Sequence, residues 1–293
     1  MKSINSHLTA VYAIKAQEIE LRIAILDIDL LLLQEGVIPE LLDQLTAQIE
    51  SDRCLNHPII VDSESYLVLD GVHRVTALKK LKCTRIPACL VDYKNPAIEI
   101  FSWHRTISGT NATNQLIAQV QHMGGKVEKV NHIEENGIGV PPVFAAIKSL
   151  DENFLMSFKF KGLKEAYDVI ACIEKRLKSL GFEINYETES DAQQKLTQRQ
   201  AEAILLTPKL SKESIIDTAR SKEIFARKAS RHIIPARPML TRVPLDLLKS
   251  NKPLSEVNQI LKNMLQKKRF KRIPYGSIFE GRRYEEDLYV FED

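Results

Sequence analysis

The sequence predicts an α/β fold arranged in two lobes, and three observations lead to this prediction. Short runs rich in Ile, Val and Leu alternate with longer segments in which apolar residues recur at helical spacing. Gly residues and polar turns separate these segments. The 293 residues, 44% of them hydrophobic and 27% charged, are typical of a globular protein that is long enough for one large domain or two ordinary ones.

The composition excludes several classes of protein. A net charge of +3, from 41 basic and 38 acidic residues, argues against a protein that mainly coats nucleic acid. No apolar run reaches the roughly 18 residues that cross a bilayer, and we expect no secretory signal in the N-terminal residues. The four cysteines form no CxxC pair, and neither they nor the histidines have zinc-ligand spacing, so we expect buried thiols in a reducing cytoplasm.

The first part of the chain alternates between apolar runs and one clear helix. Residues 11–36 suggest a strand or helix followed by an apolar element. Residues 39–52 predict a helix, because Pro39 suits a first turn and apolar residues recur at helical spacing. Residues 59–69 predict a hairpin with its turn at 62–65, and a helix at 74–82 and strands at 85–93 and 97–103 follow.

The remaining elements follow the same logic. We expect an amphipathic helix from Asn111 or Thr113 to Gly124, two strands around the turn at 151–153, a helix stopped by Gly181, and a further strand. A strand at 201–208 and a helix capped by Ser211 come next. An amphipathic helix then ends in the basic run 267–272, which we interpret as a solvated face, and a terminal strand closes the chain.

The segment Asp70-Gly71-Val72-His73-Arg74 lies where a buried strand gives way to a helix. Such a turn suits phosphate, because the helix N-terminus offers N–H groups and Gly71 lets the backbone approach an anion. Arg74 adds a planar cation, His73 a donor and Asp70 a possible ligand for Mg²⁺. The structural alternative is that Asp70 only caps the helix and Arg74 only pairs with a surface acid. No GxxxxGK[ST] motif is present, so this is not a P-loop.

The stretch "HPIIVDSESYLVLDGVHRVTALKKLKCTRIPACLVDY" resembles the core of the ParB/sulfiredoxin-like superfamily. Val72 stands where sulfiredoxins carry their catalytic Cys, and Val72-His73 departs from the Gly-Glu-Arg-Arg box of chromosome-partition proteins. The DGxHR form resembles free L-serine kinases, both the archaeal ADP-dependent and the staphylococcal siderophore-pathway types. The segments "LLLQEGV" with Glu35, "IEIFSWHRT" with Trp103, and "KASRHIIPARPMLTRVPLDLL" extend the resemblance over most of the chain.

The resemblance implies an L-serine kinase that forms O-phospho-L-serine, for cysteine or siderophore biosynthesis. Glu35 would be the general base, with a pKa raised by its apolar surroundings, and Asp70 and His73 would take part in catalysis. Residues Asp70 to Arg74 would bind the nucleotide, with Mg²⁺ on Asp70. ATP is favoured over ADP, because the tail beyond about residue 250 looks like the bacterial relative. Serine would be bound by five residues, Ser51, Trp103, Ser230, Arg231 and His232. His104 and Arg105 are interpreted as surface residues.

The expected architecture is a ParB/sulfiredoxin-like nucleotide-binding core at 1–110, completed by 229–250. A second α/β lobe would occupy 111–228, with the active site in the cleft between the lobes, and 251–293 would form a C-terminal extension. The alternative from another functional class is a ParB-like nucleotide-binding regulator or DNA-binding partition protein, although no helix-turn-helix reader is evident. A kinase for another small hydroxyl compound is also open. The sequence predicts no oligomeric state.

Overall fold

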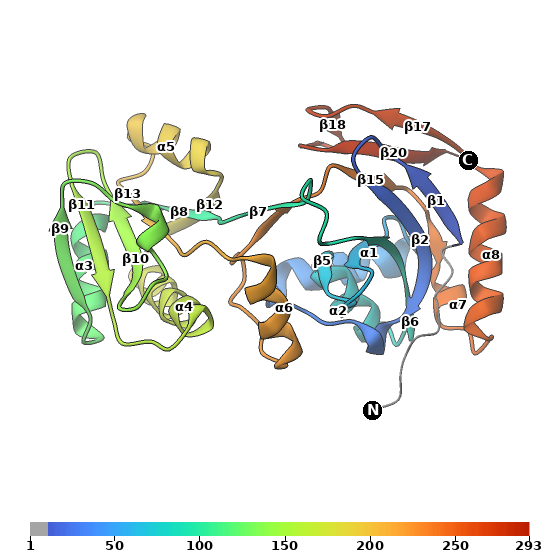
Figure 1. Cartoon of the computed structure of the whole chain (residues 1–293), viewed down its shortest axis with the longest axis horizontal. Helices are drawn as coiled ribbons and strands as arrows, with labels where there is room; N and C mark the ends of the chain where they lie inside the picture. The colour runs from blue at the N-terminus through green and yellow to red at the C-terminus, as the bar shows by residue number, and fades with distance from the viewer. Residues whose placement is uncertain (1–10, 293) are drawn as a thin grey trace. The chain divides into compact units, whose positions relative to one another are not determined.

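The computed structural model of the protein describes residues 11–292, which form two compact units (Figure 1). Unit 1 holds the chain up to Glu99 and from His232 onward, and unit 2 holds Ile100–Arg231. The chain passes from one unit to the other in β7 (Glu99–Phe101) and returns in β14 (Arg231–Ile233), and these two strands pair in a small sheet. The domain boundaries expected at residues 110, 228 and 250 remain predictions.

The main sheet of unit 1 has the strand order β1-β2-β6-β4-β5. Its strands are β1 (Tyr12–Lys15), β2 (Glu20–Asp27), β4 (Ile59–Asp62), β5 (Val68–Asp70) and β6 (Arg85–Val91). Only β4 and β6 pair in parallel, and the other neighbours are antiparallel. The β4–β5 pair is the hairpin that the sequence predicts. The end of β5 leads directly into the next helix.

Helices α1 (Pro39–Asp52) and α2 (Val72–Lys80) pack against each other in unit 1. Pro39 occupies the first turn of α1, as the sequence predicts. Helix α2 begins two residues earlier than the expected position 74, because Gly71 ends the strand and the backbone turns immediately into the helix. A 3-10 helix, Ile28–Leu30, follows β2.

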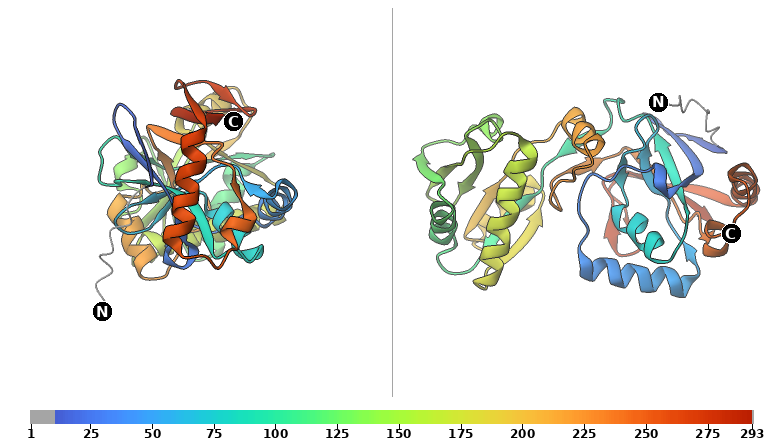
Figure 2. Two further views of the ribbon diagram at one scale, coloured as in Figure 1. Left: turned by 90° about the vertical axis from the view of Figure 1, so that its right-hand side faces the viewer. Right: turned by 90° about the horizontal axis from the view of Figure 1, so that it is seen from below.

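The C-terminal part of unit 1 adds helix α8 (Leu254–Lys267), which packs on β2 and is seen along its length in Figure 2. The Asn258 side chain fixes this packing, because its amide accepts from the Ile25 N–H at 2.8 Å and donates to the Ile25 carbonyl at 3.1 Å. A three-stranded sheet in the order β15-β20-β17 follows. Its strands are β15 (Ala236–Met239), β17 (Arg269–Ile273) and β20 (Asp287–Glu292).

The smaller elements of unit 1 are β3 (Cys54–Leu55), β16 (Val243–Pro244), helix α7 (Leu245–Leu248), β18 (Ile278–Phe279) and β19 (Arg282–Arg283). The basic run at 267–272 is exposed, as expected for a solvated face, but it lies mostly on a strand. The interpretation as a helix terminus is therefore wrong beyond Lys267. Antiparallel pairing with β20 makes residues 269–273 extended, and that partner lies too far along the chain for local periodicity to reveal it.

Unit 2 is built on a six-stranded antiparallel sheet in the order β12-β8-β13-β10-β11-β9. The strands are β8 (His104–Ser108), β9 (Lys126–Val130), β10 (Val143–Lys148), β11 (Asn153–Ser157), β12 (Glu183–Glu187) and β13 (Ala203–Leu206). Strands β8 and β9 had no counterpart in the sequence prediction. The expected pair around residues 151–153 is β10–β11.

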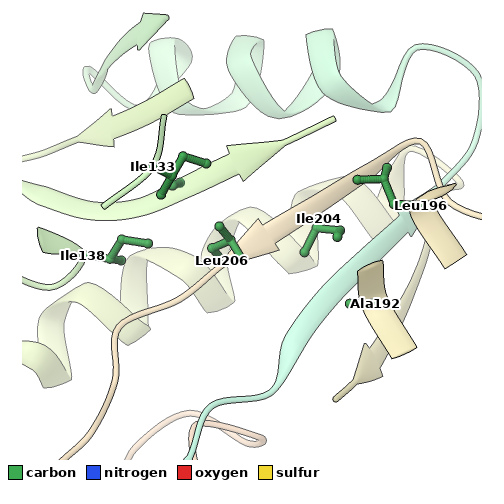
Figure 3. Close-up of a cluster of buried hydrophobic side chains, with 7 residues drawn as sticks. Ile133, Ile138, Ala192, Leu196, Ile204 and Leu206 are labelled. Carbon is green, nitrogen blue, oxygen red and sulfur yellow. The ribbon is translucent and has the colours of Figure 1, made fainter. Parts of the chain in front are cut away.

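The helices of unit 2 are α3 (Ala112–His122), α4 (Leu163–Ser179), α5 (Glu189–Thr197) and α6 (Lys212–Arg220), with a 3-10 helix at Glu135–Gly137. Ser211 caps α6 through a reciprocal pair of bonds with Ser214, which confirms its predicted role. Helix α5, which the sequence prediction missed, contributes Ala192 and Leu196 to an apolar cluster that also contains Ile204 and Leu206 of β13 (Figure 3).

None of the helices in residues 11–292 is both long and apolar enough to span a membrane. The cysteines in this range are all unbridged, and Cys83 and Cys89 are buried. Burial raises the pKa of the Cys89 thiol to about 12, so this side chain behaves as a small apolar core residue.

Candidate active site

The turn between β5 and α2 has a conformation that requires glycine. Gly71 has φ = +108°, which side chains other than glycine rarely adopt. A Cβ atom added there would lie 2.5 Å from Cγ2 of Ile59 and 2.9 Å from Nε of Arg74. Val72 is buried as the first residue of α2, so the early N–H groups of the helix lie directly after the bend. These groups have no partners within a helix and suit an anion.

Asp70 and Arg74 are tied together across this turn. The Arg74 guanidinium donates to Oδ2 of Asp70 at 2.9 Å and to the carbonyls of His57 and Pro58 at 3.3 and 2.5 Å. Asp70 does not cap the helix through its side chain, and Arg74 pairs with this partly covered acid instead of a surface one. Arg74 therefore fixes the shape of the turn, whatever else it contacts.

A second arginine reaches Asp70 from the distant strand β15. Arg237 donates to the same Oδ2 atom at 2.7 Å. Burial alone would raise the pKa of the Asp70 carboxyl, but the charges of Arg74, Arg237 and Arg282 outweigh it and hold the pKa well below its usual range. The carboxylate therefore stays ionised at neutral pH and is paired with both guanidinium groups.

The loop that carries Glu35 is fixed against this turn at both of its ends. The Ile38 N–H donates to Nε2 of His73 at 2.9 Å, and the Gln34 amide donates to the Leu69 carbonyl at 3.4 Å. Because Nε2 of His73 accepts this bond, the neutral ring carries its proton on Nδ1. Glu35 is half-buried between these two anchors. Residues 34–38 and 69–73 thus form one cluster in unit 1.

His232 joins this cluster from the returning part of the chain. Its Nε2 atom hydrogen-bonds to the Tyr93 hydroxyl at 2.7 Å, and its Nδ1 atom lies 3.5 Å from the Gln34 amide nitrogen. Gln34 therefore links His232 to the end of β5. The sequence analysis missed Gln34, Tyr93 and Arg237, because no local pattern in the sequence indicates the distant partner of a single polar residue.

Three other candidate residues form a separate group in unit 2. The Trp103 indole N–H donates to the Ser230 carbonyl at 3.1 Å, and the Arg231 guanidinium lies 5.7 Å from the centre of the Trp103 ring. Ser230 is buried and Trp103 is half-buried. The structure therefore brings together the predicted tryptophan and the late Ser-Arg pair, although they are more than a hundred residues apart in the chain.

The expectation that His104 and Arg105 are surface residues is wrong. They begin β8, which lies between β12 and β13, and only 7% and 1% of their surfaces are exposed. The Arg105 charge is compensated by Glu174, whose Oε1 accepts from Nε at 2.8 Å. Arg105 also donates to the Trp103 carbonyl at 2.6 Å, so it fixes the backbone next to the tryptophan.

The structure does not bring Ser51 to either group. Ser51 is exposed in the last turn of α1, whose first residue follows the Ile38 anchor. At about 1.5 Å per residue, Ser51 lies about 18 Å along the helix axis from Pro39. Its predicted role in substrate binding stays a prediction.

Comparison with known proteins supports the resemblance that the motifs indicate. No family model matches the chain. An ATP-dependent L-serine kinase of Staphylothermus marinus is 28% identical over 235 residues, which cover 77% of this chain and 90% of that protein. An ADP-dependent L-serine kinase of Thermococcus kodakarensis is 23% identical over 186 residues, or 63% of this chain and 74% of that protein.

The solved structures give the fold. A free serine kinase in complex with AMP superposes with a TM-score of 0.67 at 19% identity, over 81% of this chain and 97% of its own. The fold is that of free serine kinases. The predicted α/β class and the predicted resemblance to serine kinases are confirmed. The difference between the two coverage values means that this chain has additional residues, which the sequence analysis assigns to the C-terminal tail.

Proposed function

We propose that this protein is a free L-serine kinase, which transfers the terminal phosphoryl group of a nucleoside polyphosphate to the serine hydroxyl. The O–P bond to the leaving phosphate breaks, a new O–P bond forms at the serine oxygen, and the hydroxyl proton is released. The products with ATP are O-phospho-L-serine and ADP. The observation that carries the proposal is the anchoring of the Glu35 loop against the glycine turn through His73 and Leu69, in a chain related to serine kinases.

Glu35 is the proposed general base. A serine hydroxyl is a weak nucleophile at neutral pH, so a positioned carboxylate that accepts its proton accelerates the transfer. Glu35 is half-buried, and both ends of its loop are anchored, which restricts where its carboxylate can lie. His73 lies in the same cluster, where its Nδ1–H is suited to donate to a phosphate oxygen.

The N-terminus of α2 is the proposed phosphate site. Gly71 allows close approach, the N–H groups from Val72 onward face an anion, and Arg74 holds the bend in shape. Asp70 is already paired with two guanidinium groups, so it suits a metal ion that arrives with phosphate better than a bare cation. We therefore expect nucleotide and metal to arrive together.

Mg²⁺ is the proposed metal, and it would neutralise charge on the transferred phosphoryl group. Within residues 11–292 no cluster of three or more His, Cys, Asp or Glu side chains could form a protein cage for a metal ion. Mg²⁺ in kinases is commonly held by one or two carboxylates together with phosphates and water, and the ionised Asp70 fits that limited role. Both guanidinium bonds to Asp70 use Oδ2, so Oδ1 is the atom for the metal or its water.

Serine is a zwitterion, and the residues that the sequence analysis assigns to its binding, His232, Trp103, Ser230 and Arg231, stay a prediction. A guanidinium is the natural partner of the serine carboxylate. The proposed role of Ser51 in serine binding rests on the sequence alone. ATP is the favoured donor, although relatives of this chain include both ATP-dependent and ADP-dependent enzymes.

The test is incubation of the purified protein with L-serine, Mg²⁺ and either ATP or ADP, followed by mass spectrometry for phosphoserine. Product with at least one donor, and its loss on addition of EDTA, is the expected result. Absence of product with both donors would contradict the kinase assignment. L-threonine, ethanolamine and glycerate as competing acceptors would decide whether serine is the preferred alcohol.

A further inference from the structure

The C-terminal hairpin β18–β19 lies against the proposed nucleotide turn in unit 1. Its two-residue loop is Glu280-Gly281, with φ of +48° and +76°, and Phe279 pairs with Arg282. Positive φ at both loop positions is the type I′ geometry that closes a tight hairpin.

The loop contacts the turn through His57. Oε2 of Glu280 lies 3.1 Å from Nε2 of His57, and the His57 carbonyl accepts from Arg74 at 3.3 Å. The other ring nitrogen of His57 accepts from the Leu240 N–H at 3.2 Å, so the ring is held on both sides. The hairpin loop therefore reaches the Asp70–Arg74 pair indirectly, because Glu280 contacts His57 and His57 contacts Arg74.

The segment after the hairpin contacts the same turn through Arg237. Arg237 pairs with Asp70 on one side and with the buried Glu286 on the other. The centre of the Tyr284 ring lies 5.8 Å from the Arg237 guanidinium and 4.9 Å from the Arg282 guanidinium. Residues 280, 284 and 286, which alternate along the chain, therefore all take part in contacts around Asp70.

Arg282 belongs to the same alternating set but differs from the others in its partners. Its side chain is exposed, and it forms no ion pair with any residue in the part of the chain that the structure describes. Its charge nevertheless contributes to lowering the pKa of the Asp70 carboxyl, after the effects of burial, Arg74 and Arg237. An exposed cation without an acidic partner, close to a turn suited to phosphate, is arranged to attract an anion.

We propose that Arg282 is a phosphate-binding residue of the nucleotide site, carried by the C-terminal hairpin and oriented by the Tyr284 ring. The inference rests on the proposed kinase function and extends it to a segment that the motif analysis did not connect with catalysis. The ligand is the anionic phosphate chain of the nucleotide. Glu286 and Glu280 act as positioning residues, through Arg237 and His57.

The experiment compares full-length wild-type protein with Arg282→Gln, and measures ATP and ADP affinity by titration calorimetry with Mg²⁺ at low and moderate salt. Loss of a partly exposed charged contact to phosphate is expected to weaken binding roughly five- to tenfold and to reduce its salt dependence. Arg282→Lys, which keeps the charge, should retain affinity within about threefold, since Lys also binds phosphate as a point charge.

Arg283→Gln is the matched control. It removes the same charge from the adjacent residue of β19, whose side chain points to the opposite face of the strand. Its affinity should equal that of the wild type. Wild-type affinity in Arg282→Gln, or an equal loss in Arg283→Gln, would overturn the inference while leaving the kinase proposal intact. A wild-type protein that binds neither nucleotide would overturn both.

Discussion

At the scale of single residues, the position of Glu35 depends on its neighbours. The Ile38 N–H and the Gln34 side chain hold the loop on His73 and Leu69, and the glutamate lies between these anchors. A base must lie within hydrogen-bond reach of the proton that it removes, so fixed loop ends are a requirement of the proposed role. The same reasoning does not apply to Glu40, which is exposed in the first turn of α1.

Glu35→Gln is therefore expected to lower kcat by about 10²- to 10⁴-fold, because an amide cannot accept the hydroxyl proton. The substitution keeps the size of the side chain and leaves the glycine turn unchanged, so nucleotide affinity should remain within about twofold of wild type. Steady-state kinetics and calorimetry measure the two quantities. Glu40→Gln is the control with unchanged kcat, and near-normal turnover in Glu35→Gln would remove Glu35 from its role.

The residues of the turn also show what local sequence can predict. The five-residue motif predicts the roles of Gly71 and Arg74, since it places a glycine at a strand-to-helix bend and a basic residue in the first turn of the helix. Arg237 does not, because its ion pair with Asp70 spans 167 positions in the chain. No periodic pattern links residues that only the folded sheets bring together.

At the scale of elements, a buried ion pair joins the sheet of unit 2 to α4. Arg105 on β8 and Glu174 on α4 are almost completely buried, and Glu174 also accepts from the Tyr186 hydroxyl of β12 at 2.6 Å. Removal of one partner would leave an uncompensated charge in the buried interior of unit 2. The sequence analysis placed Arg105 at the surface, because the neighbouring strands of the six-stranded sheet that bury it come from distant parts of the chain.

Arg105→Met is expected to lower the free energy of unfolding by about 3–5 kcal/mol, because Glu174 loses its partner. The double variant Arg105→Met with Glu174→Leu should recover most of this loss. Lys164→Met removes the more exposed Lys164–Asp168 pair and should cost less than about 1 kcal/mol. Urea denaturation followed by circular dichroism measures all three. Equal effects of Arg105→Met and Lys164→Met would show that the buried pair does not stabilise unit 2.

At the scale of the whole molecule, buried histidines make stability depend on pH. Burial lowers the pKa of His57 in unit 1, where Arg74 and Arg237 reinforce the shift and Glu280 opposes it, and burial lowers the pKa of His104 in unit 2. Around His104, Glu189 and Glu135 oppose the shift, while Arg105 and Lys209 reinforce it. A folded pKa below the ordinary value of 6.5 means that the unfolded chain binds more protons below that pH.

The free energy of unfolding should therefore be at its full value above about pH 6.5 and should fall as the pH decreases toward 5, by at most about 1.4 kcal/mol per pH unit for each histidine. Asp70, with its lowered pKa, extends the loss below about pH 4. His104→Gln should flatten the slope between pH 7 and 5, whereas the same change at the exposed His122 should not. Urea denaturation at a series of pH values provides the measurement, and an unchanged slope in His104→Gln would contradict this account.

The amino-acid sequence by itself determined the elements whose pattern is local. Helices α3, α4 and α8 follow from apolar spacing, the cap of α6 from Ser211, and the glycine turn from the short motif that contains it. These features depend on residues within one or two turns of each other, so no knowledge of the fold is needed to predict them.

Only the tertiary structure decided which polar residues share a site. The Gln34–His232 contact, the two arginines on Asp70, the exposed β17 and the buried Arg105 depend on strand pairing between distant parts of the chain. Hydrogen bonds and ion pairs act over a few ångströms in space and leave no periodic trace along the sequence. The sequence therefore predicts the candidate nucleotide turn, while the residues that hold this turn in place are identified only in the folded structure.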